Sequence, residues 1–149
     1  MAEPRTINIA VFMDEVMPIN GPLMLVLPRS HKQGVLAAGH DEETTSYPLW
    51  TLDKETVTRL VDEGGIVAPT GKPGSVLMFH GNLVHASAPN ITPYPRRIVY
   101  LTLCAVSNYI RHPTRPEWIA HRDFTPIEPV PDNALSQYAR SAMSRAAAE

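Results

Sequence analysis

The sequence predicts a mostly-β domain of antiparallel strands, arranged as a sandwich or a jelly roll, with two short helices. Short apolar stretches, several of them with alternating polarity, are separated by turn-forming residues along the chain. Proline is unusually frequent, at 15 of 149 residues, and it breaks helices and ends strands. The length suits one hydrophobic core, so residues 1–149 are expected to form a single jelly-roll or sandwich domain.

The first two strands follow from apolar patterning. Residues 6–16, TINIAVFMDEV, form a predicted strand because alternate residues at its start are apolar. Asn20-Gly21 is a strong turn signal, and residues 23–27 are then a short, wholly apolar strand. We therefore expect these two strands to form a hairpin.

The rest of the chain continues as short elements. A helix is expected after Asp53, whose carboxylate can cap it, and before Gly64-Gly65, which can end it. Before this helix the sequence predicts a polar loop over residues 28–48. After it, two strands are expected within residues 71–87, joined by a turn near Gly81-Asn82, and a further strand over residues 96–106. The chain is then expected to continue as an extended proline-rich segment over residues 111–131 and a C-terminal helix or frayed tail over residues 132–149.

Composition argues against several classes of partner. The net charge is −2 with histidine neutral, which provides no basic surface for nucleic acid. No apolar run approaches the roughly 20 residues that a membrane-spanning helix needs, and the first residues lack the features of a secretion signal. The one cysteine, Cys104, lies in the apolar stretch YLTLCAV and is expected to be a buried strand residue. A cytoplasmic protein without disulfides is the simplest interpretation.

The stretch FHGNLVHASAPNITPYPRR, residues 79–97, carries the strongest candidates for chemistry. His85 stands at a predicted strand end and Arg96 opens the next strand, so two neighbouring antiparallel strands would bring them together. An imidazole can bind iron, and a guanidinium can bind a carboxylate through two hydrogen bonds. From spacing alone, a hairpin with a surface arginine is the simpler explanation. A zinc hydrolase built on His80 and His85 is weaker still, since their spacing puts them on opposite faces of a continuous strand.

Three longer stretches shift this balance: NGPLMLVLPRSHKQG, GSVLMFHGNLVHASAPNITPYPRR and RPEWIAHRDFTPI. Together they resemble the phytanoyl-CoA dioxygenase family, and within it the ectoine hydroxylase-like bacterial members, over residues Pro4 to Pro126. The resemblance implies a double-stranded β-helix, which is a jelly-roll or cupin-like fold. It also implies a dioxygenase that uses Fe(II), 2-oxoglutarate and O2 to hydroxylate a small organic substrate.

The resemblance assigns roles to individual residues. His85 matches the distal iron-binding histidine of the family. Arg96 and Ser87 match the arginine and the hydroxyl that hold the far carboxylate of 2-oxoglutarate, whereas His80 is not an expected ligand. Ile98 stands where ectoine hydroxylases have a substrate-binding asparagine, which argues against ectoine as the substrate.

The resemblance also indicates that half of the iron site is missing. The family's other two ligands form a His-x-Asp or His-x-Glu pair ahead of the strand expected at residues 6–16, which is where this sequence begins. Two internal stretches match the His-x-Asp or His-x-Glu pattern. His40-Asp41-Glu42 lies in the polar loop and His121-Arg122-Asp123 follows the distal histidine, so both are expected to be exposed polar residues rather than ligands.

Three interpretations of the chain follow. It is a C-terminal fragment of a dioxygenase, a degenerate homologue, or one part of a site that a second chain completes. The fragment is favoured, with a jelly-roll core incomplete at the N-terminus and unpaired strands that would promote a homodimer. The alternative function is a non-catalytic jelly-roll binding or oligomerisation module, because one imidazole alone binds Fe(II) weakly.

Overall fold

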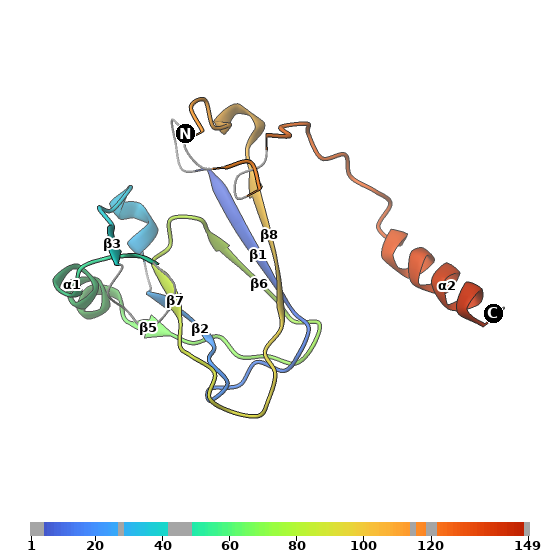
Figure 1. Ribbon diagram of the computed structural model, residues 1–149, viewed down its shortest axis with the longest axis horizontal. Coiled ribbons are helices and arrows are strands. Elements are labelled where there is room, and N and C mark those ends of the chain that lie inside the picture. The colour runs from blue at the N-terminus through green and yellow to red at the C-terminus, as the bar shows by residue number, and fades with distance from the viewer. Residues whose placement is uncertain (1–4, 27–28, 42–48, 114–115, 119–121, 148–149) are drawn as a thin grey trace. The chain divides into compact units, whose positions relative to one another are not determined.

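The computed structural model describes residues 5–26, 29–41, 49–113, 116–118 and 122–147. The chain divides into two compact units, residues 1–113 and 114–149, and each is described by itself. The first unit contains every strand of the described residues, in two three-stranded sheets and one two-stranded sheet (Figure 1). The second unit contains one helix, α2, over Ala134–Ala146.

The first sheet has the strand order β6-β1-β8, with all pairs antiparallel. Its strands are β1 (Thr6–Phe12), β6 (Val76–His80) and β8 (Ile98–Cys104). In the central strand, Ala10 and Phe12 are buried and point to the same face. We call this the inner face of the sheet.

The second sheet has the order β5-β2-β7, again antiparallel, with the bounds β5 (Ile66–Val67), β2 (Leu23–Val26) and β7 (His85–Ser87). Leu23 and Leu25 of β2 form a buried cluster with Phe79 and Leu83. Leu77 of β6 packs against this cluster and also against a second one that contains Ala10 and Phe12. The inner face of the first sheet therefore packs on β2, as in a jelly roll.

The remaining elements are short. Strands β3 (Gly39–Asp41) and β4 (Leu49–Thr51) pair with each other, and 3-10 turns cover Ser30–Gln33 and Val106–Asn108. Helix α1 (Lys54–Gly64) confirms the expected helix, since Asp53 accepts a hydrogen bond from the Thr56 N–H at 2.8 Å. Gly65 ends it with a positive φ of 78°.

The expected hairpin between the first two strands is wrong, because β1 and β2 belong to different sheets. The connection between them is organised by Asn20, which is fully buried. Its side chain accepts from the Met17 N–H at 2.8 Å and donates to the Glu15 carbonyl at 2.9 Å. These local bonds shape the connection through which the chain leaves β1 and enters β2 of the second sheet.

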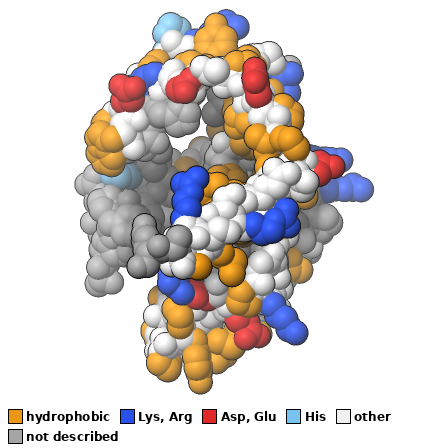
Figure 2. All heavy atoms as spheres, turned by 90° about the vertical axis from the view of Figure 1, so that its right-hand side faces the viewer, with side chains coloured by type: hydrophobic (Ala, Val, Ile, Leu, Met, Phe, Trp, Pro, Cys, Tyr) orange, Lys and Arg blue, Asp and Glu red, His pale blue; other side chains and the backbone are white. Residues whose placement is uncertain are grey.

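The outer face of the first sheet is almost entirely apolar. Its large side chains are between 38% and 64% exposed: Ile7, Val76, Met78, Val99, Leu101 and Leu103. Hydrophobic side chains are accordingly common on the molecular surface (Figure 2). Cys104, expected to be buried, is exposed, because it ends the edge strand β8 and no described layer covers that edge. Exposed apolar faces of this kind are typical of surfaces that another layer or another polypeptide covers.

Candidate functional site

His85 begins β7, and the backbone before it fixes the state of its ring. The Nδ1 atom lies 2.7 Å from the carbonyl oxygen of Leu83. A carbonyl only accepts, so Nδ1 donates, and the neutral ring then has its lone pair on Nε2. The ring also meets that of Phe79 edge to face, with centroids 4.9 Å apart. His85 is thus held in the tautomer that a metal-binding imidazole needs, and metal-ligating histidines usually donate their other ring N–H to a carbonyl or carboxylate in this way.

A buried serine positions the start of β7. Ser30 Oγ donates to the carbonyl of Val26 at 2.8 Å and accepts from the N–H of Val84 at 3.1 Å. Val84 directly precedes His85, so Ser30 ties the histidine to the end of β2. Patterns in the sequence gave no sign of this role, because it depends on two residues 54 positions apart.

The two adjacent arginines, Arg96 and Arg97, differ in their hydrogen-bond partners. Arg97 is exposed and binds Asp14 through its backbone N–H, Nε and Nη2, at 2.7, 2.9 and 2.7 Å. These hydrogen bonds, from the side chain first and then from the backbone, lower the pKa of Asp14 to about 2, and Asp14 raises the pKa of Arg97. Arg96 has no such partner. Its Nε atom is buried and has no hydrogen-bond partner among the described residues.

An unpaired, buried guanidinium N–H is costly, and such groups are usually satisfied by a protein, water or ligand acceptor. Arg96 lies two residues before Ile98, so alternation places both side chains on the inner face of the first sheet. The missing acceptor therefore belongs on the inner side of that sheet. A carboxylate is the group that best matches a guanidinium.

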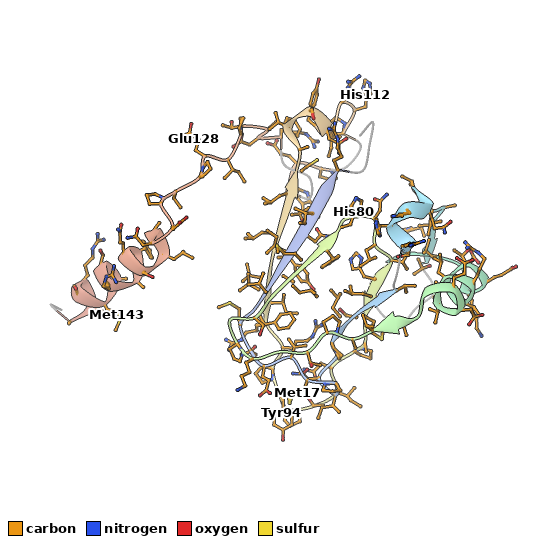
Figure 3. All side chains as sticks on the ribbon, turned by 180° about the vertical axis from the view of Figure 1, so that it is seen from behind. Met17, His80, Tyr94, His112, Glu128 and Met143 are labelled. Carbon is orange, nitrogen blue, oxygen red and sulfur yellow. The ribbon has the colours of Figure 1, made fainter. Side chains whose placement is uncertain are left out.

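The loop before Arg96 rests on the β1–β2 connection. Asn20 Nδ2 donates to the Pro95 carbonyl at 3.5 Å, and Gly21, with a φ of 77°, backs directly onto the loop. A Cβ atom at Gly21 would lie 2.5 Å from the Ala88 carbonyl oxygen. The two segments meet at one end of the unit, as the neighbouring positions of Met17 and Tyr94 illustrate (Figure 3).

Ser87 shares one face of β7 with His85, because the two residues are two apart in a strand. That face is the one of Leu23 and Leu25, which are the register partners of Ser87 and His85. Both Ser87 and His85 are exposed. The expected placement of His85 and Arg96 on neighbouring strands is wrong, since β7 and β8 lie in different sheets. The three residues come instead from two sheets whose inner faces pack on each other.

His80 differs from His85 in both direction and tautomer. It pairs with Ile7 and so projects on the outer face of the first sheet. Its Nδ1 accepts from the Asn82 N–H at 3.0 Å, which leaves the proton of a neutral ring on Nε2. Its ring stacks against His31, with centroids 5.2 Å apart. This geometry supports the interpretation of His80 as a bystander and argues against a zinc site shared with His85.

The internal candidates for the remaining iron ligands gain no support. His40 lies in β3, whereas Glu42 and His121 fall outside the described residues, as does the side chain of Asp41. Asp123 caps a local turn by accepting from the Thr125 N–H at 2.9 Å. Within the part of the chain that the structure describes, no three His, Cys, Asp or Glu side chains are grouped as a metal site.

Comparison with known proteins now decides the family. The profile of the phytanoyl-CoA dioxygenase (PhyH) family matches residues 1–98. The chain belongs to this family. It is 39% identical over 135 residues to the ectoine dioxygenase of Sphingopyxis alaskensis, an alignment that covers 82% of this chain and 43% of that protein. It is 31% identical over 145 residues to the L-proline trans-4-hydroxylase of Streptomyces griseoviridis, covering 91% of this chain and 54% of that protein.

Solved structures of the family confirm the fold. A crystal structure of EctD from S. alaskensis with bound Fe superposes with a TM-score of 0.65 at 37% identity, covering 83% of this chain and 41% of that chain. A second, with 2-oxoglutarate and 5-hydroxyectoine, gives 0.64 at 38% identity, covering 80% and 39%. The expected jelly roll with an incomplete core is therefore confirmed. The chain spans about half, or less, of the length of these relatives.

No helix among the described residues is long and apolar enough to cross a membrane. The names of these relatives give ectoine and L-proline as their substrates, and both are small molecules. This agrees with the expectation of a small-molecule substrate. Beyond family and fold, the roles of His85, Ser87 and Arg96 remain predictions.

Proposed function

We propose that this chain forms the distal-histidine and cosubstrate-binding part of an Fe(II)- and 2-oxoglutarate-dependent hydroxylase acting on a small organic substrate. The observation that carries the proposal is the buried, unpartnered Nε of Arg96, beside an Arg97 that is fully engaged with Asp14. Arg97 has its acceptor in Asp14, whereas the described residues supply no acceptor for Nε of Arg96. The far carboxylate of 2-oxoglutarate has the right charge and shape for it.

His85 supplies the second half of the argument. Its Nδ1 is bonded to Leu83, so Nε2 can donate a lone pair to iron without a change of tautomer. When bound, Fe(II) with 2-oxoglutarate and O2 supplies the oxidising power for C–H hydroxylation. The residues of this chain would bind and orient these groups: Arg96 and Ser87 would hold the cosubstrate carboxylate, and His85 would hold the metal.

One imidazole does not make an iron site, and the donor set of the described residues fits Fe(II) only in part. The proposal therefore includes two further ligands, His and Asp or Glu, from polypeptide of the same protein or of another chain. The relatives are about twice as long as the matched region, which leaves room for such a segment. The apolar outer face of the first sheet also requires a covering layer, and a homodimer is one way to supply it.

The first test measures the binding of 2-oxoglutarate by calorimetry and by the guanidinium Nε–H signals in NMR spectra. Arg96→Gln should weaken binding by ~10- to 100-fold, as expected for loss of a charged, two-bond contact. Arg140→Gln removes the same charge from the exposed helix α2 and serves as the matched control. Equal affinities for the two variants would refute the role of Arg96.

The second test concerns catalysis. The chain with Fe(II), 2-oxoglutarate and O2 is assayed for succinate, alone and after addition of the N-terminal part of a relative. His85→Gln should abolish whatever iron binding and succinate formation are seen. A non-catalytic binding or oligomerisation module is the second candidate, favoured by the absence of a three-residue metal cluster among the described residues. Unchanged iron content in His85→Gln would leave only that candidate.

Location and substrate complete the proposal. A cytoplasmic enzyme fits a chain with one cysteine and no disulfide. Ectoine and L-proline are the substrates by which the relatives are named, and they are the first compounds to assay. Ile98, on the inner face beside Arg96, lacks the polar group expected for a close copy of an ectoine site.

A further inference from the structure

Strand β8 forms one edge of the first sheet, and no strand of the described residues pairs with its outer side (Figure 1). The Met13 N–H donates to the Arg97 carbonyl at 3.0 Å, and hydrogen-bonded pairs recur at every second residue, so the odd-numbered residues of β8 bond to β1. The backbone N–H and C=O groups of the even-numbered residues Ile98, Tyr100 and Thr102 therefore point away from β1. They form a row of donors and acceptors along the edge of the sheet.

This edge has none of the features that usually protect an edge strand. The seven residues of β8, Ile98–Cys104, include no charge, proline or glycine. Side chains are exposed on both faces of the strand. On the outer face, Val99, Leu101 and Leu103 are between 38% and 50% exposed, and on the inner face Tyr100 is 46% exposed. A long, uncharged edge of this kind is a template for a further strand.

The order of residues in β8 suits pairing with a second copy of itself. When two copies run antiparallel about Leu101, Leu101 lies opposite its own copy, and Val99 lies opposite Leu103 of the other chain. Tyr100 then lies opposite Thr102 as a hydrogen-bonded pair, because the backbone groups of these residues point outward. A twofold axis repeats each of these contacts, so the arrangement closes after two chains.

Charge distinguishes antiparallel from parallel pairing. Arg96 and Arg97 come just before β8 in the chain. In a parallel, in-register pair, the arginines of the two copies would lie side by side and repel each other. In the antiparallel register about Leu101, Arg97 lies opposite Ala105 of the other copy, so the two arginine pairs stand at opposite ends of the joined strands. The antiparallel register therefore keeps the apolar contacts and avoids the repulsion.

We propose that β8 is a homodimer interface, in which the β8 strands of two copies pair antiparallel about Leu101 and join their first sheets into one continuous sheet. The partner is a second copy of this chain, since the strand is complementary to itself in side chains, backbone groups and charge. The inference goes beyond the proposed hydroxylase function and does not depend on it, because it uses neither His85 nor the acceptor of Arg96.

The test measures the mass of the full chain, residues 1–149, by analytical ultracentrifugation over a range of concentrations. The unaltered chain should show a reversible equilibrium between monomer and dimer. Leu101→Lys places two ammonium groups opposite each other at the twofold axis and should raise the dissociation constant of the dimer by ~10- to 100-fold. A monomer at every concentration, an open-ended aggregate, or a dimer that Leu101→Lys leaves unchanged overturns the proposal.

Met78→Lys is the matched control. Met78 and Leu101 are both register partners of Ile9, one on each side of β1, and they are 64% and 50% exposed on the same outer face. Met78 belongs to β6, at the other edge of the sheet, so Met78→Lys should leave the dissociation constant unchanged. Equal weakening by the two changes would show that the sheets stack face to face and would refute pairing through β8.

A mixing experiment tests the register, and it stays decisive if Leu101→Lys alone prevents dimerisation for another reason. Leu101→Glu should also dissociate the dimer, whereas an equimolar mixture of the Leu101→Lys and Leu101→Glu variants should form a mixed dimer, because residue 101 faces its own copy. A mixture that stays monomeric refutes this register. The unaltered chain is also tested with the N-terminal part of a relative. A chain that is monomeric alone and binds that segment would assign the edge to another polypeptide and exclude self-pairing.

Discussion

Replacement of Gly21 by alanine tests how the two sheets are joined. Gly21 has a φ of 77°, and an added Cβ would lie 2.5 Å from the Ala88 carbonyl oxygen and 3.2 Å from the Asn90 nitrogen. These are backbone atoms, so no side chain can move aside. The left-handed conformation alone costs an alanine about 1–2 kcal/mol, and forcing apart a packed contact adds about 1–3 kcal/mol. We expect Gly21→Ala to lower the free energy of unfolding by roughly 2–5 kcal/mol.

Gly74 provides the matched control. It also has a positive φ, of 87°, but an added Cβ would meet nothing within 4 Å. Gly74→Ala should therefore show only the conformational cost, about 1–2 kcal/mol. Urea unfolding of both variants, followed by circular dichroism, measures the difference. Equal losses for the two glycines would show that the close approach at Gly21 does not hold the connection against the loop.

Two further predictions concern single contacts. Ser30→Ala removes a buried hydroxyl together with its bonds to the Val26 carbonyl and the part-buried Val84 N–H, and should cost about 1–3 kcal/mol of unfolding free energy. Ser144→Ala, on the exposed helix α2, should cost close to nothing in the same urea titration. Similar values for the two would contradict the proposed support of β7. The pKa of Asp14 is lowered from 3.8 to about 2 by Arg97, so the stability that this pair contributes is fully present above about pH 4 and is lost as the pH falls toward 2. Asp14→Asn should flatten the dependence of the unfolding midpoint on pH in that window, and an unchanged dependence would show that the pair contributes nothing.

Local signals in the sequence predicted elements better than partners. The helix after Asp53 was predicted from a cap and a glycine stop, and both act within a few residues. The Asn20-Gly21 signal predicted a turn correctly but a hairpin wrongly, because strand pairing is decided by distant segments. β1 pairs with strands that begin about 70 and 90 residues later, and no local pattern contains that information.

In the candidate site, too, the sequence identified individual residues but not the contacts that position them. His85 and Arg96 could be selected from the sequence through the family resemblance. The structure was needed to tell Arg96 from Arg97 as the candidate cosubstrate ligand. Arg97 binds Asp14, whereas Nε of Arg96 is buried without a partner among the described residues. The tautomer of His85 depends on a carbonyl two residues back, and its placement depends on Ser30, so neither was predictable from residue types alone.

The arginine pair has a consequence for sequence variation in the loop over residues 88–95. Arg97 is fixed from the β1 side, because its carbonyl accepts from the Met13 N–H at 3.0 Å and its side chain and N–H bind Asp14. The bonds that hold Arg97 therefore also set the direction of the Arg96 side chain, and the loop that leads to Arg96 does not. Changes within the loop that keep its contacts with Asn20 and Gly21 should leave the direction of Arg96 unchanged. A one-residue shift between Arg97 and β8 would instead exchange the two arginines and point Arg97 inward.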